Sequence, residues 1–176
     1  MWKIVRQIAR TGIRTEPTPQ AVGPAAHVDG PALSAERIHR DILAVLGRAL
    51  AIRAVDAGSC NGCELEIHAL GNPYYNIEGL GIRFVASPRH ADMLLVTGPV
   101  SRNMAEALRR TYDAVPDPKL VVAIGDCGCT GGVFGQNYAS CGRVANLLPV
   151  DESVPGCPPP PVEILSGILR AVRRRA

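Results

Sequence analysis

The chain has 176 residues, 47% of them hydrophobic and 20% charged, a balance that excludes a disordered chain and suits one domain with a buried core. The formal net charge of +3 and the aromatic content of 4% give no support to nucleic-acid binding, which relies on basic surfaces and stacking platforms. Six cysteines, 15 prolines and 18 glycines are the features that call for an explanation.

Residues 1–33 are predicted to form an amphipathic helix followed by an extended, proline-rich arm. Over residues 2–14, apolar side chains recur on one face and Lys3, Arg6 and Arg10 on another, at spacings of three and four. Such a helix suits a membrane surface or a partner protein, or packs on its own domain. The three basic residues interrupt the apolar stretch that a secretory signal needs, so we expect no such signal.

Residues 34–176 are predicted to form a single α/β domain. Ser34 is a plausible N-cap for a helix whose apolar spacing continues to Leu50. Short apolar runs predict four strands, and helical patterns predict three further helices: strands over 52–56, 82–86, 93–97 and 120–124, and helices over 64–70, 102–114 and 161–174. We therefore expect a flavodoxin-like open, mostly parallel sheet flanked by helices. No apolar run is long enough to span a bilayer.

Five of the six cysteines follow predicted strands or precede the last helix. Cys60 and Cys63 come after the first strand, Cys127 and Cys129 after the fourth, and Cys157 before the closing helix. Ligands of open α/β sheets bind beyond the carboxyl ends of the strands. The cysteines are therefore predicted to converge at that edge.

The cysteines lie in three glycine- or proline-rich segments, which favours an iron–sulfur cluster. A [4Fe-4S] cluster needs four thiolates and gains from backbone N–H groups near its sulfurs, and the turns around Cys60, Cys63, Cys127 and Cys157 supply both. Two other interpretations remain open. The Cys60-x-x-Cys63 pair alone is typical of thioredoxin-like redox sites. With Cys127 and Cys129 it could also form a zinc site, although Cys157 would then be unexplained.

Several sequence blocks together resemble a known family. These are Asp-Ala-Gly-Ser-Cys-Asn-Gly-Cys-Glu (56–64), Ser-Pro-Arg-His-Ala-Asp (87–92), Leu-Leu-Val-Thr-Gly (94–98), Gly-Asp-Cys (125–127) and Val-Pro-Gly-Cys-Pro-Pro (154–159). They resemble the small subunit of membrane-bound, energy-converting [NiFe] hydrogenases, nearest to the formate hydrogenlyase and hydrogenase-4 branch. That family is homologous to the 20 kDa subunit of respiratory complex I, and the resemblance covers roughly residues 50–165.

The resemblance implies an oxidoreductase subunit that has no complete active site of its own. Cys60, Cys63, Cys127 and Cys157 would hold one [4Fe-4S] cluster next to the active site of a hydrogenase-type large subunit. A ferredoxin-like iron–sulfur subunit would exchange electrons with it. Membrane subunits would hold the complex peripherally on the cytoplasmic side of the inner membrane.

Two alternative functions follow from the same residues. A complex I-like subunit would pass electrons to quinone, but that subunit carries two adjacent cysteines where this chain has Cys60-x-x-Cys63. A zinc-stabilised interaction module without a redox role is the alternative from another class of protein.

Further polar residues near these blocks allow both a structural and a functional interpretation. By the family pattern, Cys129 occupies a position that tolerates Ser, Ala, Gly or Cys, and Cys141 matches no ligand motif. We expect both to be small buried thiols, with a ligand role for Cys129 as the alternative. Glu64 and Glu66 suit the first turn of a helix or, alternatively, a proton relay. The resemblance places His90 near the cluster or the partner, where it would be a candidate for coupling a proton to reduction.

Overall fold

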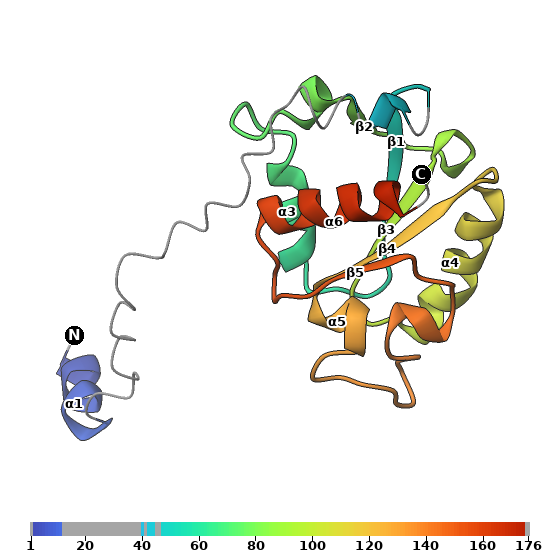
Figure 1. The fold of residues 1–176 in the computed structure, drawn as a ribbon. Coiled ribbons are helices and arrows are strands. Elements are labelled where there is room, and N and C mark those ends of the chain that lie inside the picture. Colours follow the sequence, from blue (N-terminus) through green and yellow to red (C-terminus); the bar gives the residue numbers. More distant parts are fainter. Residues whose placement is uncertain (1, 12–39, 41, 45–46, 175–176) are drawn as a thin grey trace. The chain divides into compact units, whose positions relative to one another are not determined.

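The residues that the computed structural model describes are 2–11, 40, 42–44 and 47–174 (Figure 1). They fall into two units, Met1–Ala32 and Leu33–Ala176.

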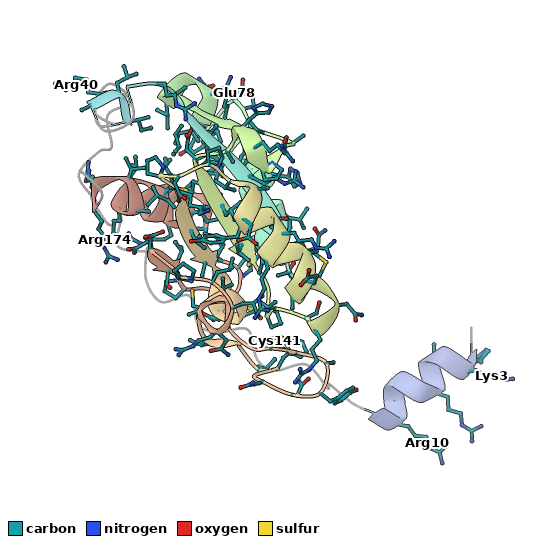
Figure 2. The ribbon with its side chains drawn as sticks, turned by 90° about the vertical axis from the view of Figure 1, so that its right-hand side faces the viewer. Lys3, Arg10, Arg40, Glu78, Cys141 and Arg174 are labelled. Atoms are coloured by element: carbon teal, nitrogen blue, oxygen red, sulfur yellow. The ribbon has the colours of Figure 1, made fainter. Side chains whose placement is uncertain are left out.

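The first unit contains helix α1 (Trp2–Thr11), which confirms the predicted N-terminal helix. Trp2 and Val5 are exposed, and Lys3 and Arg10 extend from the helix (Figure 2). The proline-rich arm and Ser34 lie outside the described residues, so the boundary between arm and domain stays a prediction. Within the described part of the chain, no helix is both long and apolar enough to cross a membrane.

The second unit is built on a parallel sheet. Its described strands are β1 (Leu50–Asp56), β2 (Ile82–Phe84), β3 (Met93–Thr97), β4 (Leu120–Ile124) and β5 (Glu152–Val154). They pair in the order β2-β1-β3-β4-β5, every neighbouring pair parallel. This is the strand order of flavodoxin-like folds, so the predicted fold class is confirmed.

Three strand assignments differ from the sequence-based prediction. Strand β2, expected over 82–86, ends at Phe84. Leu50, expected at the end of a helix, is the first residue of β1 and pairs with Ile82 of β2, because a fully buried position beside the sheet core outweighs helical spacing. Strand β5 was not predicted, since it has three residues and an exposed serine at its centre.

Helices cover both faces of the sheet. The described helices are α3 (Gly62–Ala69), α4 (Arg102–Ala114), α5 (Gly125–Thr130) and α6 (Pro161–Arg173), with short 3-10 turns at Ile77–Leu80, Pro88–His90 and Val144–Asn146. Helices α3 and α6 lie on one face and α4 on the other (Figure 1). Ser101 caps α4, its hydroxyl accepting the Met104 N–H at 3.3 Å.

The central strands β3 and β4 are buried along their whole length and divide the core into two layers. Leu95 packs in one cluster with Ile168 of α6, whereas its neighbour Leu94 packs in the other with Leu108 of α4. Alternate residues of a strand point to opposite faces, and each buried leucine contributes about 1.5–3 kcal/mol. The sheet is therefore a firm platform for the turns at its carboxyl edge.

A buried carboxylate fastens α6 to the edge strand. Glu152 of β5 is only 8% exposed; its two oxygens lie 2.9 Å from Arg170 Nε and 2.9 Å from Arg174 Nη1. A buried charge is tolerated when it is paired in this way. Two arginines of the basic C-terminal helix are thus engaged within the domain.

Candidate functional site

The first cysteine turn, residues 57–61, leaves the carboxyl end of β1 and is shaped by the aspartate that ends that strand. Asp56 Oδ1 accepts the N–H groups of Gly58 and Ser59, both at 2.7 Å, an arrangement that reverses the chain. Asn61, with φ of 71°, occupies the left-handed region that Asn tolerates better than most residues. Cys60 therefore precedes α3 and Cys63 lies in its first turn.

A carboxylate ties this turn to the neighbouring strand. Glu64 accepts a hydrogen bond from Ser59 Oγ at 2.5 Å and another from the buried Thr97 Oγ1 at the end of β3. Glu64 also lies in the first turn of α3, where a negative charge is favourable. The structural interpretation of Glu64 is therefore supported by its contacts, and Ser59 and Thr97 are partners that sequence reasoning missed.

The second cysteine turn contains Cys127 and the third contains Cys157. The two turns are hydrogen-bonded to each other through Asp126 and Gly156, which are 30 residues apart in the chain. The Asp126 N–H donates to the Gly156 carbonyl at 2.8 Å, and Asp126 Oδ1 accepts the Gly156 N–H at 2.7 Å. Asp126 directly precedes Cys127 and Gly156 directly precedes Cys157. This reciprocal pair fixes the separation of the two cysteines.

The structure brings together all four cysteines proposed as ligands. Burial, and after it the charges of Glu64 and of the Cys60, Cys127 and Cys157 thiolates, together raise the pKa of Cys63 to about 12. Burial likewise raises the pKa of Cys127, with Cys157, Cys60 and Asp126 as further causes. The geometry agrees: a Cβ on Gly125, two residues before Cys127, would lie 2.6 Å from Cys63 Sγ and 3.4 Å from the carbonyl oxygen of Gly156, the residue before Cys157. The three turns that carry the cysteines therefore meet, as predicted.

Two glycines keep space open beside these thiols. A Cβ on Gly125, whose φ is +81°, would lie 2.6 Å from Cys63 Sγ, and a Cβ on Gly132, whose φ is +55°, would lie 2.8 Å from Cys127 Sγ. Only glycine meets both the backbone and the contact requirement here. Four neighbouring thiols beside such glycines are a donor set that suits an iron–sulfur cluster.

The other two cysteines point elsewhere. Cys129 lies two residues after Cys127 in the six-residue helix α5, and side chains at this spacing do not share a helix face. Its Sγ lies 3.6 Å from the Ala123 carbonyl oxygen, and it packs with Cys141 against the α4 side of the core. Both are therefore half-buried thiols, as expected.

Within the described ranges, no three His, Cys, Asp or Glu side chains form a group arranged to hold a metal ion as they stand.

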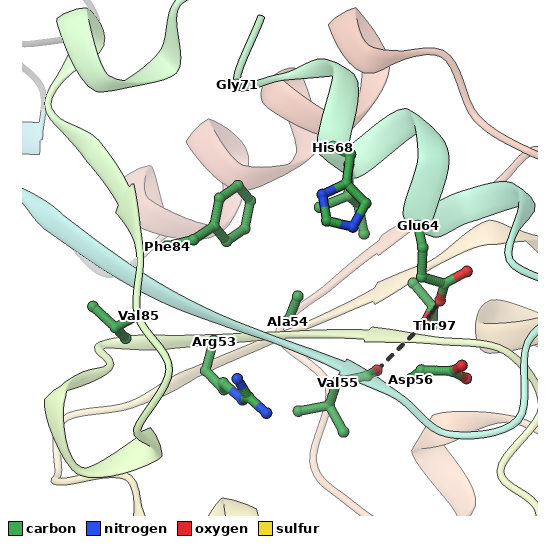
Figure 3. Close-up of a pocket in the computed structure, with 11 residues that line it drawn as sticks. Arg53, Ala54, Val55, Asp56, Glu64, His68, Gly71, Phe84, Val85 and Thr97 are labelled. Carbon is green, nitrogen blue, oxygen red and sulfur yellow. Dashed lines mark hydrogen bonds between the residues drawn. The ribbon is translucent and has the colours of Figure 1, made fainter.

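A cavity of about 420 Å³ adjoins the first cysteine turn. Asp56, Glu64 and Thr97 gather at one end of it, while His68 of α3 and Phe84 of β2 lie farther along (Figure 3). The cavity therefore extends from the cysteine edge towards the open edge of the sheet at β2.

His90 lies away from the cysteines, contrary to one expectation. It ends the short 3-10 turn Pro88–His90 just before β3 begins, at the amino edge of the sheet. The five residues of β3 separate the two edges by about 16 Å at the usual rise of a strand. His90 therefore does not lie beside the cysteine turns, and a role in coupling a proton to reduction stays a hypothesis.

The raised pKa of Cys63 predicts how the stability of the cluster-free chain depends on pH. The folded chain keeps this proton up to a pKa of about 12, whereas an unfolded chain releases it near 9.0. Above pH 9 the unfolded state therefore binds fewer protons, and the free energy of unfolding falls as pH rises towards 12. Urea unfolding of wild type and Cys63→Ala across this range measures the effect. Equal pH slopes for the two proteins would contradict it.

Fold and site together define a parallel α/β domain that gathers four thiols from three turns at its carboxyl edge. The family described as NADH ubiquinone oxidoreductase, 20 Kd subunit, matches residues 60–171. The chain belongs to this family and is thus a subunit of the oxidoreductase type.

Relatives from both branches of the expected superfamily are similar to the chain. A probable membrane-bound hydrogenase subunit of Pyrococcus furiosus is 45% identical over 74% of this chain and 78% of its own length. Formate hydrogenlyase subunit 7 of Escherichia coli is 43% identical over 74% of this chain and 51% of its own length. An NADH-quinone oxidoreductase subunit of Desulfovibrio desulfuricans is 45% identical over 70% of this chain and 67% of its own length. The resemblance drawn from the sequence blocks is confirmed.

Solved structures agree with the fold. A chain of the membrane-bound sulfane sulfur reductase, described as an archaeal respiratory membrane complex, matches with a TM-score of 0.63 and 32% identity, covering 73% of this chain and 71% of that one. A chain of an NAD⁺-reducing [NiFe]-hydrogenase matches with a TM-score of 0.57 and 18% identity, covering 73% of this chain and 94% of that one.

Proposed function

We propose that the chain is an electron-transfer subunit holding one [4Fe-4S] cluster next to the active site of a hydrogenase-type large subunit in a membrane-associated complex. The observation that carries the proposal is the meeting of Cys60, Cys63, Cys127 and Cys157 at one sheet edge, where each of the other three thiols raises the pKa of Cys63. The names of the hydrogenase relatives support the type of complex.

The residues around the thiols have separable roles in this proposal. When bound, the cluster would supply one-electron transfer. Cys60, Cys63, Cys127 and Cys157 would bind it as thiolates, and Gly125 and Gly132 leave room beside two of those sulfurs. Asp56 and Asp126 orient the turns through backbone N–H groups, and half-burial of Cys63 and Cys127 limits the access of water.

The rest of the assembly belongs to the same proposal. A ferredoxin-like iron–sulfur subunit would exchange electrons with the chain, and membrane subunits would anchor the complex peripherally on the cytoplasmic side of the inner membrane. Helix α1 is amphipathic and carries basic side chains on one face, which is compatible with a position at a membrane surface.

A second candidate, complex I-like electron transfer to quinone, is favoured by the 45% identity to the NADH-quinone oxidoreductase relative. The two candidates share the cluster and differ in what the complex oxidises or reduces. Hydrogen uptake or evolution by the purified complex supports the hydrogenase type. Quinone reduction without hydrogen turnover favours the second candidate.

The cluster is tested by composition and by cysteine substitution. Anaerobically purified protein should contain about four iron and four sulfide per chain and give an EPR signal when reduced. Cys60→Ser, Cys63→Ser, Cys127→Ser and Cys157→Ser should each lose most of that signal, because each removes one thiolate. Cys129→Ser and Cys141→Ser are the matched controls and should keep it. One zinc and no sulfide per chain, or loss of the signal in Cys129→Ser, would overturn the assignment.

A further inference from the structure

Thr97 is a buried polar residue at the edge of the sheet where the cysteine turns meet. It ends β3 and is only 1% exposed. A buried hydroxyl needs a hydrogen-bond partner, and this one donates to Glu64 Oε1 of α3 and lies 3.3 Å from the Val55 carbonyl oxygen of β1 (Figure 3). Strand β3 contains no cysteine, so a ligand role does not explain the polar group at its end.

The Glu64 carboxylate is held at both of its oxygens. Thr97 Oγ1 donates to one oxygen, and Ser59 Oγ donates to the other at 2.5 Å. An ionised carboxylate only accepts hydrogen bonds, so the hydrogens of both hydroxyls point towards Glu64. Ser59 Oγ in turn accepts the Asn61 N–H at 3.1 Å. Two hydroxyls from separate segments of the chain therefore hold one half-buried carboxylate.

The segment after β3 packs closely on the first cysteine turn. The Ala57 N–H donates to the Thr97 carbonyl at 3.0 Å, so Thr97 also contacts the turn through its backbone. A Cβ on Gly98, whose φ is +76°, would lie 2.4 Å from the backbone nitrogen of Ser59, which leaves no space between the two segments. The Thr97 hydroxyl is therefore a donor in a fixed position.

A cavity beside Glu64 offers the carboxylate a second position. Asp56, Glu64 and Thr97 line one end of the cavity of about 420 Å³ (Figure 3), and a cavity of that size has room for several water molecules. A carboxylate is far better solvated by water than by apolar groups. Without the Thr97 hydroxyl, the Glu64 side chain is therefore expected to turn into the cavity and away from the thiols.

The position of this charge affects the thiol site. Glu64 directly follows Cys63 in the chain, and after burial, which is the larger cause, its charge raises the pKa of the Cys63 thiol. The carboxylate thus opposes further negative charge on that sulfur. Reduction of a cluster bound there adds one electron, and a carboxylate held beside the sulfur opposes this charge as well. Local charge is among the quantities that set the reduction potential of a cluster.

We propose that Thr97 is a positioning residue that, with Ser59, holds the Glu64 carboxylate beside Cys63 and thereby keeps the reduction potential of the cluster low. This inference rests on the proposed function, since it assigns a residue that tunes the cluster of that proposal. In each turnover one electron enters from the ferredoxin-like subunit and one leaves to the large subunit. Thr97 acts through Glu64 and its covalent bonds do not change.

The test is an EPR redox titration of the whole purified complex. Thr97→Val replaces the hydroxyl by a methyl group, and the midpoint potential should rise towards that of Glu64→Gln, since both variants take the charge away from Cys63. Thr97→Ser keeps the hydroxyl and should keep the wild-type potential. Thr111→Val is the matched control: the Thr111 hydroxyl donates to the Ala107 carbonyl at 2.8 Å near the end of α4, away from the cysteine edge, and its loss should not move the potential.

A double variant shows whether Thr97 acts through Glu64. In Glu64→Gln the charge is already absent, so adding Thr97→Val should shift the potential no further. An unchanged or lower potential in Thr97→Val, or an equal rise with and without the Glu64 charge, would overturn the proposal. If Thr97→Val does not fold, Ser59→Ala removes the other hydroxyl from the same carboxylate and should raise the potential in its place. A wild-type potential in Ser59→Ala would then overturn the proposal.

Urea unfolding of the same variants measures the contact independently of the cluster. Because Thr97 and Glu64 are bonded to each other, the loss of stability in Thr97→Val/Glu64→Gln should be smaller than the sum of the losses in the two single variants. Additive losses would overturn the proposed contact. Absence of the EPR signal of a reduced cluster in wild type would instead overturn the proposed function, and the unfolding measurements then judge the contact alone.

Discussion

Gly125→Ala is expected to give a folded protein without a cluster. The new Cβ would lie 2.6 Å from Cys63 Sγ, far inside van der Waals contact. The cysteine can relieve this contact only by turning its sulfur away, and a displaced sulfur no longer reaches the position of a ligand. The φ of +81° at this residue adds a strain of about 1–2 kcal/mol for any residue with a Cβ. Iron and sulfide content and the EPR signal should therefore fall to near zero.

The matched control for this variant is Gly47→Ala. Gly47 has a similar φ of +65°, but a Cβ there meets nothing within 4 Å. The control therefore carries the backbone strain without the contact, and it should lose about 1–2 kcal/mol of stability and keep the cluster. A Gly125→Ala protein with a wild-type iron and sulfide content would show that the site does not need this space.

Much of the fold was predictable because it is encoded locally. The continuous apolar runs of β3 and β4 are typical of strands covered on both faces, and Ser101 is a recognisable cap for α4. Helix α5 was not predicted, since Gly125 and Gly128 lower the helical propensity of six residues. Its formation depends on packing against β4 and β5, which no local pattern reveals.

The meeting of the four cysteines at one sheet edge was predictable, but the residues that support their turns were not. Asp56 directly precedes a glycine-containing turn, a pattern that signals an Asx turn, so its role could have been inferred. The pairing of Asp126 with Gly156 spans 30 residues and two separate loops, and the contact between Glu64 and Thr97 spans 33. Such partners depend on the register of the sheet. The same sheet places His90 before β3, at the edge opposite the cysteine turns. That His90 lies in a family motif of the sequence therefore did not show where it lies in the fold.

Asp126 joins two of the three cysteine turns, and its removal should loosen both. Its carboxylate accepts the Gly156 N–H at 2.7 Å, and a hydrogen bond to a charged group contributes about 1.5–3 kcal/mol. In Asp126→Ala that N–H loses its acceptor, so Cys127 and Cys157 are no longer held at a fixed separation. Faster loss of the cluster to an iron chelator is expected, by roughly tenfold or more.

Asp126→Asn separates the charge of this residue from its geometry. The amide oxygen can still accept the Gly156 N–H, so the cluster should be retained, but the negative charge that raises the pKa of Cys127 is gone. Reduction adds an electron to the site, and a nearby carboxylate opposes that added charge; its removal should therefore raise the reduction potential. An EPR redox titration of wild type and both variants measures this. If Asp126→Asn has the potential of wild type and Asp126→Ala has its chelator resistance, Asp126 neither positions the two cysteines nor tunes the site, and the two turns must be held by the sheet alone.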